Sequence, residues 1–214
     1  FNPNITWEKT NNYNLGLDFE LFKNGILSGA FDVYKRKTND LLAVVPVPPG
    51  QGLSSTFIDN IGSIDSKGFE ANLDVKVIQS EDLNLNIGGN IAYNYSEVSD
   101  LQGISSVQAS ESGLPTGTGF FLANHAVGYQ PYSAWVFQQI YDEQGQPIPN
   151  AFRDLNGDNQ ITNEDRYYKA LRPNWTYGFT TTVNYKNFDL VANFRGQIGG
   201  QVYNSRIITT GFTD

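Results

Sequence analysis

Residues 13–21 read YNLGLDFEL, a run in which apolar and polar side chains alternate. The apolar members stand at odd positions: Tyr13, Leu15, Leu17, Phe19 and Leu21. The polar members beside them are Asn12, Asn14, Asp18 and Glu20. Because successive side chains of a β-strand point to opposite faces, this run predicts a strand with one apolar face and one polar face.

The same period of two returns in residues 69–77, 83–95 and 177–195. The side chains predicted on the apolar face, which we expect to meet lipid, include Leu15, Leu17, Phe19, Leu73, Val75 and Leu85. Those predicted on the polar face, which we expect to line a lumen, include Asn14, Asp18, Glu20, Asn72, Asp74, Asn84 and Asn86. Alternation alone does not decide between a protein core and a lipid bilayer as the cover of the apolar face.

Strand length and the connections favour the bilayer. Strands are predicted over about 7–22, 26–43, 62–78, 83–96, 175–185 and 188–197. Several are about 14–18 residues long, whereas ordinary strands have about 5–6. Short turns alternate with long loops at about 44–61 and 99–172, as in outer-membrane barrels, whose short turns are periplasmic. Residues 99–172 then form one extracellular excursion, and 135–141 belong to it rather than spanning alone.

The alternative is a soluble, calcium-stabilised β-sandwich that acts as a carbohydrate-binding module. In that fold the apolar faces of two sheets meet each other and form a core. The strand lengths and the one-sided loop lengths weigh against it.

Composition excludes several classes of protein. No run approaches 18 consecutive apolar residues, so a transmembrane helix is not expected. The net charge is −8 with only 14 Lys and Arg, so nucleic acid is not expected as a partner. There is no cysteine, which rules out disulfides and cysteine-based zinc sites. The chain starts at Phe1 without a signal-peptide pattern, and we interpret it as a piece of something longer.

One motif carries metal chemistry. Residues 154–165 read DLNGDNQITNED, with oxygen-bearing side chains at the spacing of an EF-hand-type calcium loop. The predicted Ca²⁺ ligands are Asp154, Asn156, Asp158, the backbone carbonyl of Gln160, and Asp165. Two positions depart from the pattern, since Asn159 replaces a glycine and Asp165 replaces a glutamate. The alternative is a polar loop of Asx-turns that holds no metal.

Catalysis is not expected. The single histidine, His125, lies in a loop rich in Gly and Ser, and no nucleophile motif accompanies it. The carboxylate pairs Asp18 with Glu20 and Glu70 with Asp74 fit a regular polar lining better than a glycosidase pair. Aromatic residues of the second long loop, Trp135, Phe137 and Tyr141, either contact a sugar or a partner protein or pack locally.

Several segments together resemble SusC/RagA-type TonB-linked outer-membrane proteins of Bacteroidetes. The segments are NPNITWEKT at 2–10 with YNLGLD at 13–18, FDVYKRKTNDLL at 31–42, NIG at 60–62 with KGFE at 67–70, DLNGD at 154–158 with DR at 165–166, and YKNFDL at 185–190 with GQIGG at 196–200 and VYN at 202–204. They occur in the family's order and cover most of the chain.

The resemblance implies an all-β fold, part of the C-terminal half of a 22-stranded transmembrane barrel. It implies import of a glycan or a peptide, with a SusD-like surface lipoprotein as partner. It also implies energy coupling through TonB, which acts on a plug region that this sequence does not contain. The implied location is the outer membrane, in contact with its lipid.

Overall fold

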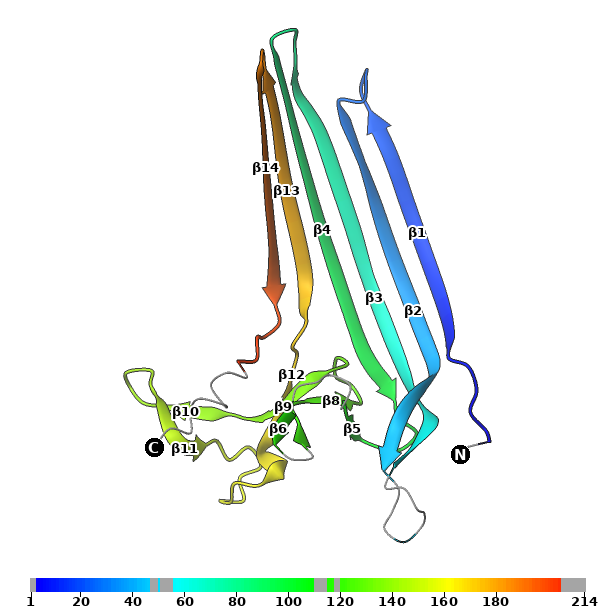
Figure 1. Ribbon diagram of the computed structural model, residues 1–214, viewed down its shortest axis with the longest axis vertical. Helices are drawn as coiled ribbons and strands as arrows, with labels where there is room; N and C mark the ends of the chain where they lie inside the picture. The colour runs from blue at the N-terminus through cyan, green and yellow to red at the C-terminus, as the bar shows by residue number, and fades with distance from the viewer. Residues whose placement is uncertain (1–2, 47–49, 51–55, 110–114, 118–119, 205–214) are drawn as a thin grey trace.

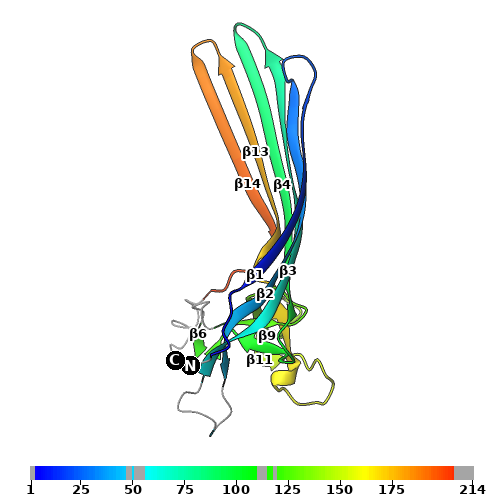
Figure 2. The same ribbon diagram turned by 90° about the vertical axis from the view of Figure 1, so that its right-hand side faces the viewer.

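The computed structural model describes residues 3–46, 50, 56–109, 115–117 and 120–204. Its main feature is one antiparallel sheet of six long strands in the order β1-β2-β3-β4-β13-β14. The strands are β1 (Lys9–Leu21), β2 (Leu27–Pro46), β3 (Thr56–Gln79), β4 (Leu83–Asp100), β13 (Pro173–Tyr185) and β14 (Phe188–Gly199). They run side by side along the long axis of the molecule (Figure 1), and the sheet is curved when seen from its edge (Figure 2).

Short turns join the strands at the end far from the small sheets. Asn24 and Gly25 in the β1–β2 turn have φ of 62° and 60°, the left-handed region that Asn and Gly tolerate best. The β13–β14 turn holds two residues, since Tyr185 pairs with Phe188. The predicted turns are therefore confirmed, including the one at 80–82.

The β2–β3 hairpin is longer than predicted. Pairing continues from Leu42 opposite Asn60 to Pro46 opposite Thr56, so the predicted loop over 44–61 was wrong at both ends. Prolines and glycines between 46 and 52 suggested a loop, but β-branched and aromatic residues on both sides favour strands. The prolines at 48 and 49 lie outside the described residues.

A bulge interrupts β2 near Asp40, which has φ of 59°. Asn60 holds the chain there: its Nδ2 donates to the carbonyls of Asp40, at 2.6 Å, and Thr6, at 2.9 Å. Its Oδ1 accepts from Thr6 N at 2.8 Å. Glu8 Oε1 accepts a further hydrogen bond from Leu42 N at 3.1 Å. Two residues of the family-like motifs therefore anchor the N-terminal segment to β2 and β3.

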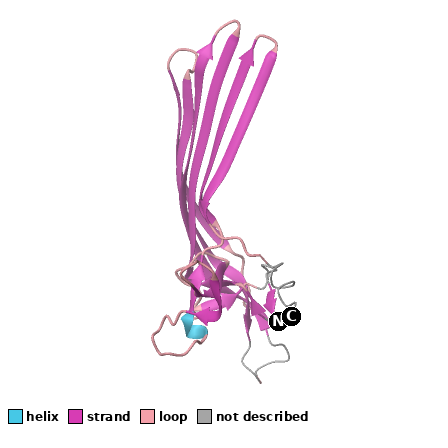
Figure 3. Cartoon of the chain, turned by 90° about the vertical axis from the view of Figure 1, so that its left-hand side faces the viewer, coloured by secondary structure: helices cyan, strands magenta, loops and turns pink. Residues whose placement is uncertain are grey.

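Residues 101–172 leave the sheet and return to it, because β4 pairs directly with β13. We call these residues the end assembly. Its strands are β5 (Ser106–Gln108), β6 (Pro115–Gly117), β7 (Phe120–Phe121), β8 (Ala123–Ala126), β9 (Ser133–Phe137), β10 (Gln139–Tyr141), β11 (Pro147–Phe152) and β12 (Arg166–Lys169). They form a four-stranded sheet β12-β9-β8-β5 and two hairpins. A short 3₁₀ helix, η2 (Asn163–Asp165), precedes β12 (Figure 3).

An apolar core joins the end assembly to the sheet. Its buried residues are Val45, Ile61, Val98, Leu101 and Val107. Backbone bonds reinforce the junction, from Val98 N to Tyr129 O at 2.9 Å and from Gly128 N to Val98 O at 2.8 Å. The end assembly is thereby fixed to the ends of β3 and β4.

The apolar face of the six-stranded sheet has no such cover. Its side chains are widely exposed, with Leu15 at 74%, Phe188 at 76% and Leu190 at 61%. Among the described residues no second sheet lies against this face, so the soluble β-sandwich is not supported. No helix in the described part of the chain has the length and hydropathy to span a membrane.

Candidate functional site

The two faces of the sheet separate polar from apolar side chains as the alternation predicts. Direct cross-strand partners share a face, so the register assigns each residue. Asp18, Ala30, Asn72, Asn90, Gly178 and Arg195 form one cross-strand row. Glu20, Ser28, Asp74, Gly88, Thr180 and Asn193 form the next. Asn14, Asn84 and Asn86 lie on this same polar face, as predicted.

The opposite face carries the predicted apolar set. Leu17, Phe31, Ala71, Ile91, Tyr177 and Gly196 form one row there, and Leu15, Val33, Phe69, Tyr93, Trp175 and Ile198 form another. Neighbouring rings are in contact, with centroids 5.7 Å apart for Phe69 and Trp175 and 4.8 Å for Tyr93 and Trp175. Phe19, Leu73, Val75 and Leu85 lie on this face as well.

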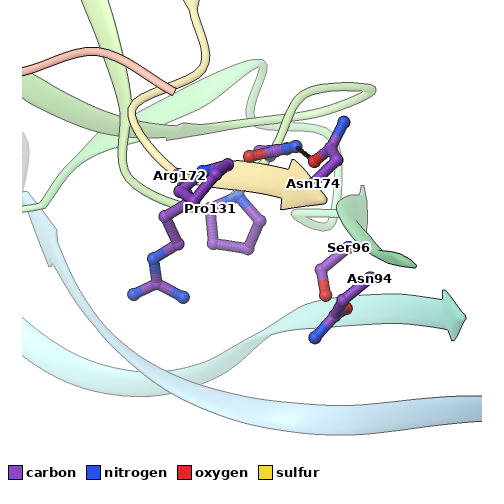
Figure 4. A pocket seen from close by; sticks show the side chains of 7 residues that line it. Asn94, Ser96, Pro131, Arg172 and Asn174 are labelled. Carbon is purple, nitrogen blue, oxygen red and sulfur yellow. Dashed lines mark hydrogen bonds between the residues drawn. The ribbon is translucent and has the colours of Figure 1, made fainter. Parts of the chain in front are cut away.

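Where the sheet meets the end assembly, the polar face is hollowed. A small cavity of about 80 Å³ is lined by Asn94 and Ser96 of β4, by Arg172, which precedes β13, and by Asn174 at the start of β13 (Figure 4). Gln130 Nε2 donates to Asn174 Oδ1 across its rim. The cavity forms because residues 101–172 fold back onto the sheet. No local sequence motif indicates that Arg172 or Gln130 would line it.

A wider groove of about 520 Å³ continues along the polar face. It is lined by Asn12, Asn14, Asp32, Tyr34, Arg36, Ser66, Glu70, Asn94 and Ser96. Asn94 and Ser96 also line the small cavity, so the two hollows adjoin each other at these residues. Carboxylates, amides, a guanidinium and a phenol together can hydrogen-bond a polar solute in many orientations.

The aromatic residues of the end assembly mostly pack against each other. Trp135 stacks on Tyr168 with centroids 6.4 Å apart, and Phe137 lies 5.1 Å from Phe152. The Arg166 guanidinium lies over both Trp135, at 4.8 Å, and Phe137, at 4.4 Å. Local packing therefore accounts for these two predicted contact residues, whereas Tyr141 remains 59% exposed.

The predicted calcium loop is organised by its own side chains. Asp154 accepts bonds from Gly157 N at 2.6 Å and Asn159 N at 2.8 Å. Asp158 Oδ1 accepts from Gln160 N at 2.8 Å. Asn159 has φ of 62°, the left-handed turn that its position in the motif requires. The bond from Gln160 N to Asp158 is an Asx-turn. The two Asp154 bonds reach three and five residues along the chain and close the loop around that carboxylate.

Asp165, the last residue of the loop, is fully buried. It accepts from Thr162 N at 2.7 Å, Leu155 N at 2.8 Å and Asn156 N at 3.4 Å. These bonds, above all that from Thr162, hold the pKa of Asp165 below its usual value, although burial acts the other way. Asp165 therefore joins the start and the end of the loop.

Only part of the predicted set of Ca²⁺ ligands is arranged around a common point. Asn156 Nδ2 lies between two carboxylates, 3.2 Å from Asp158 Oδ2 and 3.3 Å from Glu164 Oε2. Within the described ranges, no three His, Cys, Asp or Glu side chains are grouped so that they could hold a metal ion. The oxygen donors have the chemistry that Ca²⁺ prefers, and the calcium site stays a prediction.

His125 packs edge-on against Tyr132, with ring centroids 4.5 Å apart. The Arg172 guanidinium also lies over the Tyr132 ring, 4.8 Å from its centroid. The four carboxylates considered for catalysis lie in the regular polar rows, with Glu70 opposite Asp32 and Ala92.

Comparison with known proteins identifies the family of this chain. Residues 1–206 match the family described as TonB dependent receptor-like, beta-barrel. The chain is 38% identical over 208 residues to TonB-dependent receptor SusC of Bacteroides thetaiotaomicron, covering 95% of this chain and 20% of that protein. It is 30% identical over 217 residues to TonB-dependent receptor P26 of Formosa agariphila, covering 96% of this chain and 22% of that protein.

Solved structures agree. The structure of the RagAB peptide transporter matches with a TM-score of 0.69 at 27% identity, over 92% of this chain and 22% of that one. The RagAB peptide importer in its open-open state gives 0.72 at 26% identity, over 93% and 21%. The chain spans about a fifth of the length of the relatives it matches. It belongs to the TonB-dependent receptor-like β-barrel family.

Proposed function

We propose that this chain forms part of the wall of an outer-membrane transporter that imports a nutrient, a glycan or a peptide. The observation that carries the proposal is the separation of the two faces. An apolar face without a protein cover suits lipid, and a polar, hollowed face suits a solute pathway. Edge strands β1 and β14, which have one partner each among the described residues, would pair with further strands of the closed barrel.

Energy coupling and partners follow from the family. Import is driven by TonB through a plug that other parts of the receptor supply, and a SusD-like lipoprotein covers the extracellular mouth. RagAB, whose structure this chain resembles, is a peptide transporter, which supports a peptide as one of the two substrate classes. On this proposal the end assembly lies outside the cell, and no covalent chemistry occurs.

Neighbouring residues on opposite faces provide the test. This chain contains no cysteine, so Asn72→Cys and Leu73→Cys can be compared in the full-length receptor with its other cysteines removed. A bulky, membrane-impermeant maleimide should label Asn72→Cys and slow uptake of a labelled oligosaccharide or oligopeptide. Leu73→Cys should resist this reagent and react instead with a lipid-soluble thiol probe.

The matched pair separates the outcomes. Equal labelling of both positions by the impermeant reagent contradicts a wall with lipid on one side. Labelling of Asn72→Cys without any effect on uptake of either substrate contradicts a solute pathway along the polar face.

We also propose that residues 154–165 bind Ca²⁺ as a structural ion through Asp154, Asn156, Asp158, the Gln160 carbonyl and Asp165. The oxygen donors, their spacing and the left-handed Asn159 support this proposal. The Asn156 amide donor between Asp158 and Glu164 also supports it, because positive charge is favoured at that position.

Hydrogen exchange of the loop in the full-length receptor tests the ion. Added calcium should slow exchange in residues 154–165 relative to chelator, and Asp158→Ala should abolish the difference. Asp142→Ala is the matched control, since Asp142 forms an Asx-turn with Gln144 N at 3.0 Å in the β10–β11 hairpin. The same exchange with calcium and with chelator would leave a metal-free Asx-turn loop.

A further inference from the structure

The apolar face of the sheet changes character at a single cross-strand row. Up to the row of Phe69, Tyr93 and Trp175, its residues are apolar, aromatic or glycine, apart from Thr181 opposite Ile87. The next row toward the end assembly is Tyr13, Lys35, Lys67 and Tyr95. The row after it is Asn11, Lys37, Asp65 and Glu97. We call the first of these two the lysine row.

The lysine row stands at the height expected for the membrane boundary. The apolar band begins near the short turns with Leu83, opposite Tyr185, and ends with Tyr93, opposite Trp175. Ten residue steps at about 3.3 Å each give about 33 Å of strand. At a tilt of about 40° this is about 25 Å across the membrane, the height of the apolar band of such barrels. Lipid headgroups therefore begin where the lysines do.

The two lysines of this row repel each other. Lys35 and Lys67 are direct cross-strand partners on the same face, and like charges in that arrangement are destabilising. The only ion pair in the described part of the chain is Lys9 Nζ with Asp40, at 3.3 Å. Both lysines are exposed, and Lys67 lies 5.7 Å from the Tyr95 ring.

Nearby acids do not neutralise the pair. Asp65 and Glu97 face the same way in the next row, yet neither comes within 4.0 Å of a lysine among the described residues. Tyr95 donates to Glu97 Oε2 at 3.2 Å, which directs that oxygen toward the phenol. Tyr13 is 73% exposed, so its hydroxyl is free to add a hydrogen-bond donor beside Lys35.

We propose that Lys35 and Lys67, with Tyr13 beside them, bind a phosphate group on the headgroup of an anionic lipid in the outer leaflet. Two ammonium groups and a phenol supply the charge and donors that a phosphate requires. The bound anion removes the repulsion between the lysines and anchors the barrel wall at its outer boundary. This inference rests on the proposed function, because it needs the apolar face in lipid and the end assembly outside.

The test uses the full-length receptor in phosphatidylcholine nanodiscs and lipid A as the phosphorylated probe, with bound lipid measured by native mass spectrometry. Each lysine near an anionic surface contributes a factor of about five, so Lys35→Gln with Lys67→Gln should weaken binding about thirty-fold. Lys35→Arg with Lys67→Arg should retain it. The matched control, Lys76→Gln with Arg195→Gln, removes two charges from the polar face and should leave binding unchanged.

Two further arms identify the ligand. Equal binding of lipid A without its phosphates overturns the proposal, and so does displacement of the probe by the same concentration of inorganic phosphate, which would make the row a free-anion site. Equal loss in the control variant also overturns it. Insertion into nanodiscs is scored first, so a receptor that does not insert contradicts the transporter wall itself, whereas an inserted receptor without lipid A contradicts only the lysine row.

Discussion

The six-stranded sheet and the end assembly use their apolar residues in opposite ways. Every buried apolar residue among those described lies in the end assembly or at its junction with the sheet: Val45, Ile61, Val98, Leu101, Val107, Ala109, Leu122, Ala123, Ala126 and Ala134. The larger apolar side chains of the sheet lie mostly on one face and are exposed or half-buried there. The end assembly is thus organised like a small water-soluble domain, whereas the sheet relies on backbone pairing and, under the proposed function, on a lipid solvent.

The largest expected effect is a loss of stability at the core that joins the end assembly to the sheet. Leu101 is 3% exposed in the junction core, so Leu101→Ala should cost about 2–5 kcal/mol of local stability. Hydrogen exchange in the full-length receptor should accelerate at Val98 N, which bonds to Tyr129 O, and across β8 and β9. Exchange along β13 and β14 should not change. Equal acceleration in those strands would show that the two regions share one core.

The next effect addresses the sheet. Leu73 pairs with Gly29 and Gly89, midway along the apolar band, so Leu73→Arg places a charge at the bilayer centre. We expect a loss of about 2–4 kcal/mol in the unfolding free energy, measured by urea titration in lipid vesicles. Asn72→Arg, one residue away on the polar face, should cost far less. Similar losses for both variants would mean that water reaches both faces.

A smaller effect is confined to the start of η2. Thr162 caps this helix, accepting from Glu164 N at 3.2 Å, and the Asp165 side chain bonds back to Thr162 N. Thr162→Ala should cost about 1 kcal/mol, seen as faster exchange at Glu164 N. Thr162→Ser keeps the hydroxyl and should behave like the parent. Unchanged exchange in Thr162→Ala would mean that Asp165 alone holds the helix.

The same contrast explains what the sequence can predict. In the sheet, each residue's face follows from parity, and the structure confirms Leu15, Asp18, Leu73 and Asn86 in turn. Parity of the short turns also predicts that residues 99–172 leave and rejoin the sheet at the same end, and β4 indeed pairs directly with β13. Strands of two to six residues in the end assembly carry no such period, so their partners are set by long-range packing.

Functional residues divide in the same way. The polar residues that line the groove can be predicted individually from the alternation in each strand. Arg172 and Gln130, in contrast, reach the small cavity only because the end assembly folds back over Asn94 and Ser96. The calcium motif can be recognised from the spacing of its oxygen-bearing residues. The role of Asp165 as an acceptor for backbone N–H groups cannot, because it depends on Leu155 and Thr162 coming together in the fold. The lysine row needed the register, because Lys35 and Lys67 are far apart in sequence.

The smallest effect at neutral pH comes from the titration of Asp165. Its pKa is lowered in the folded loop, so the ionised form contributes stability that is present above the unfolded pKa of about 3.9 and is lost as pH falls through the lower folded value. Protection of Leu155 N and Thr162 N, both donors to Asp165, relative to the intrinsic exchange rate at each pH should therefore fall only in that acid range. Asp165→Asn should remove this pH dependence while loosening the loop at every pH. The sheet has no part in this loop, so exchange in β13 should show no matching step, and a step there would tie the loop to the barrel wall.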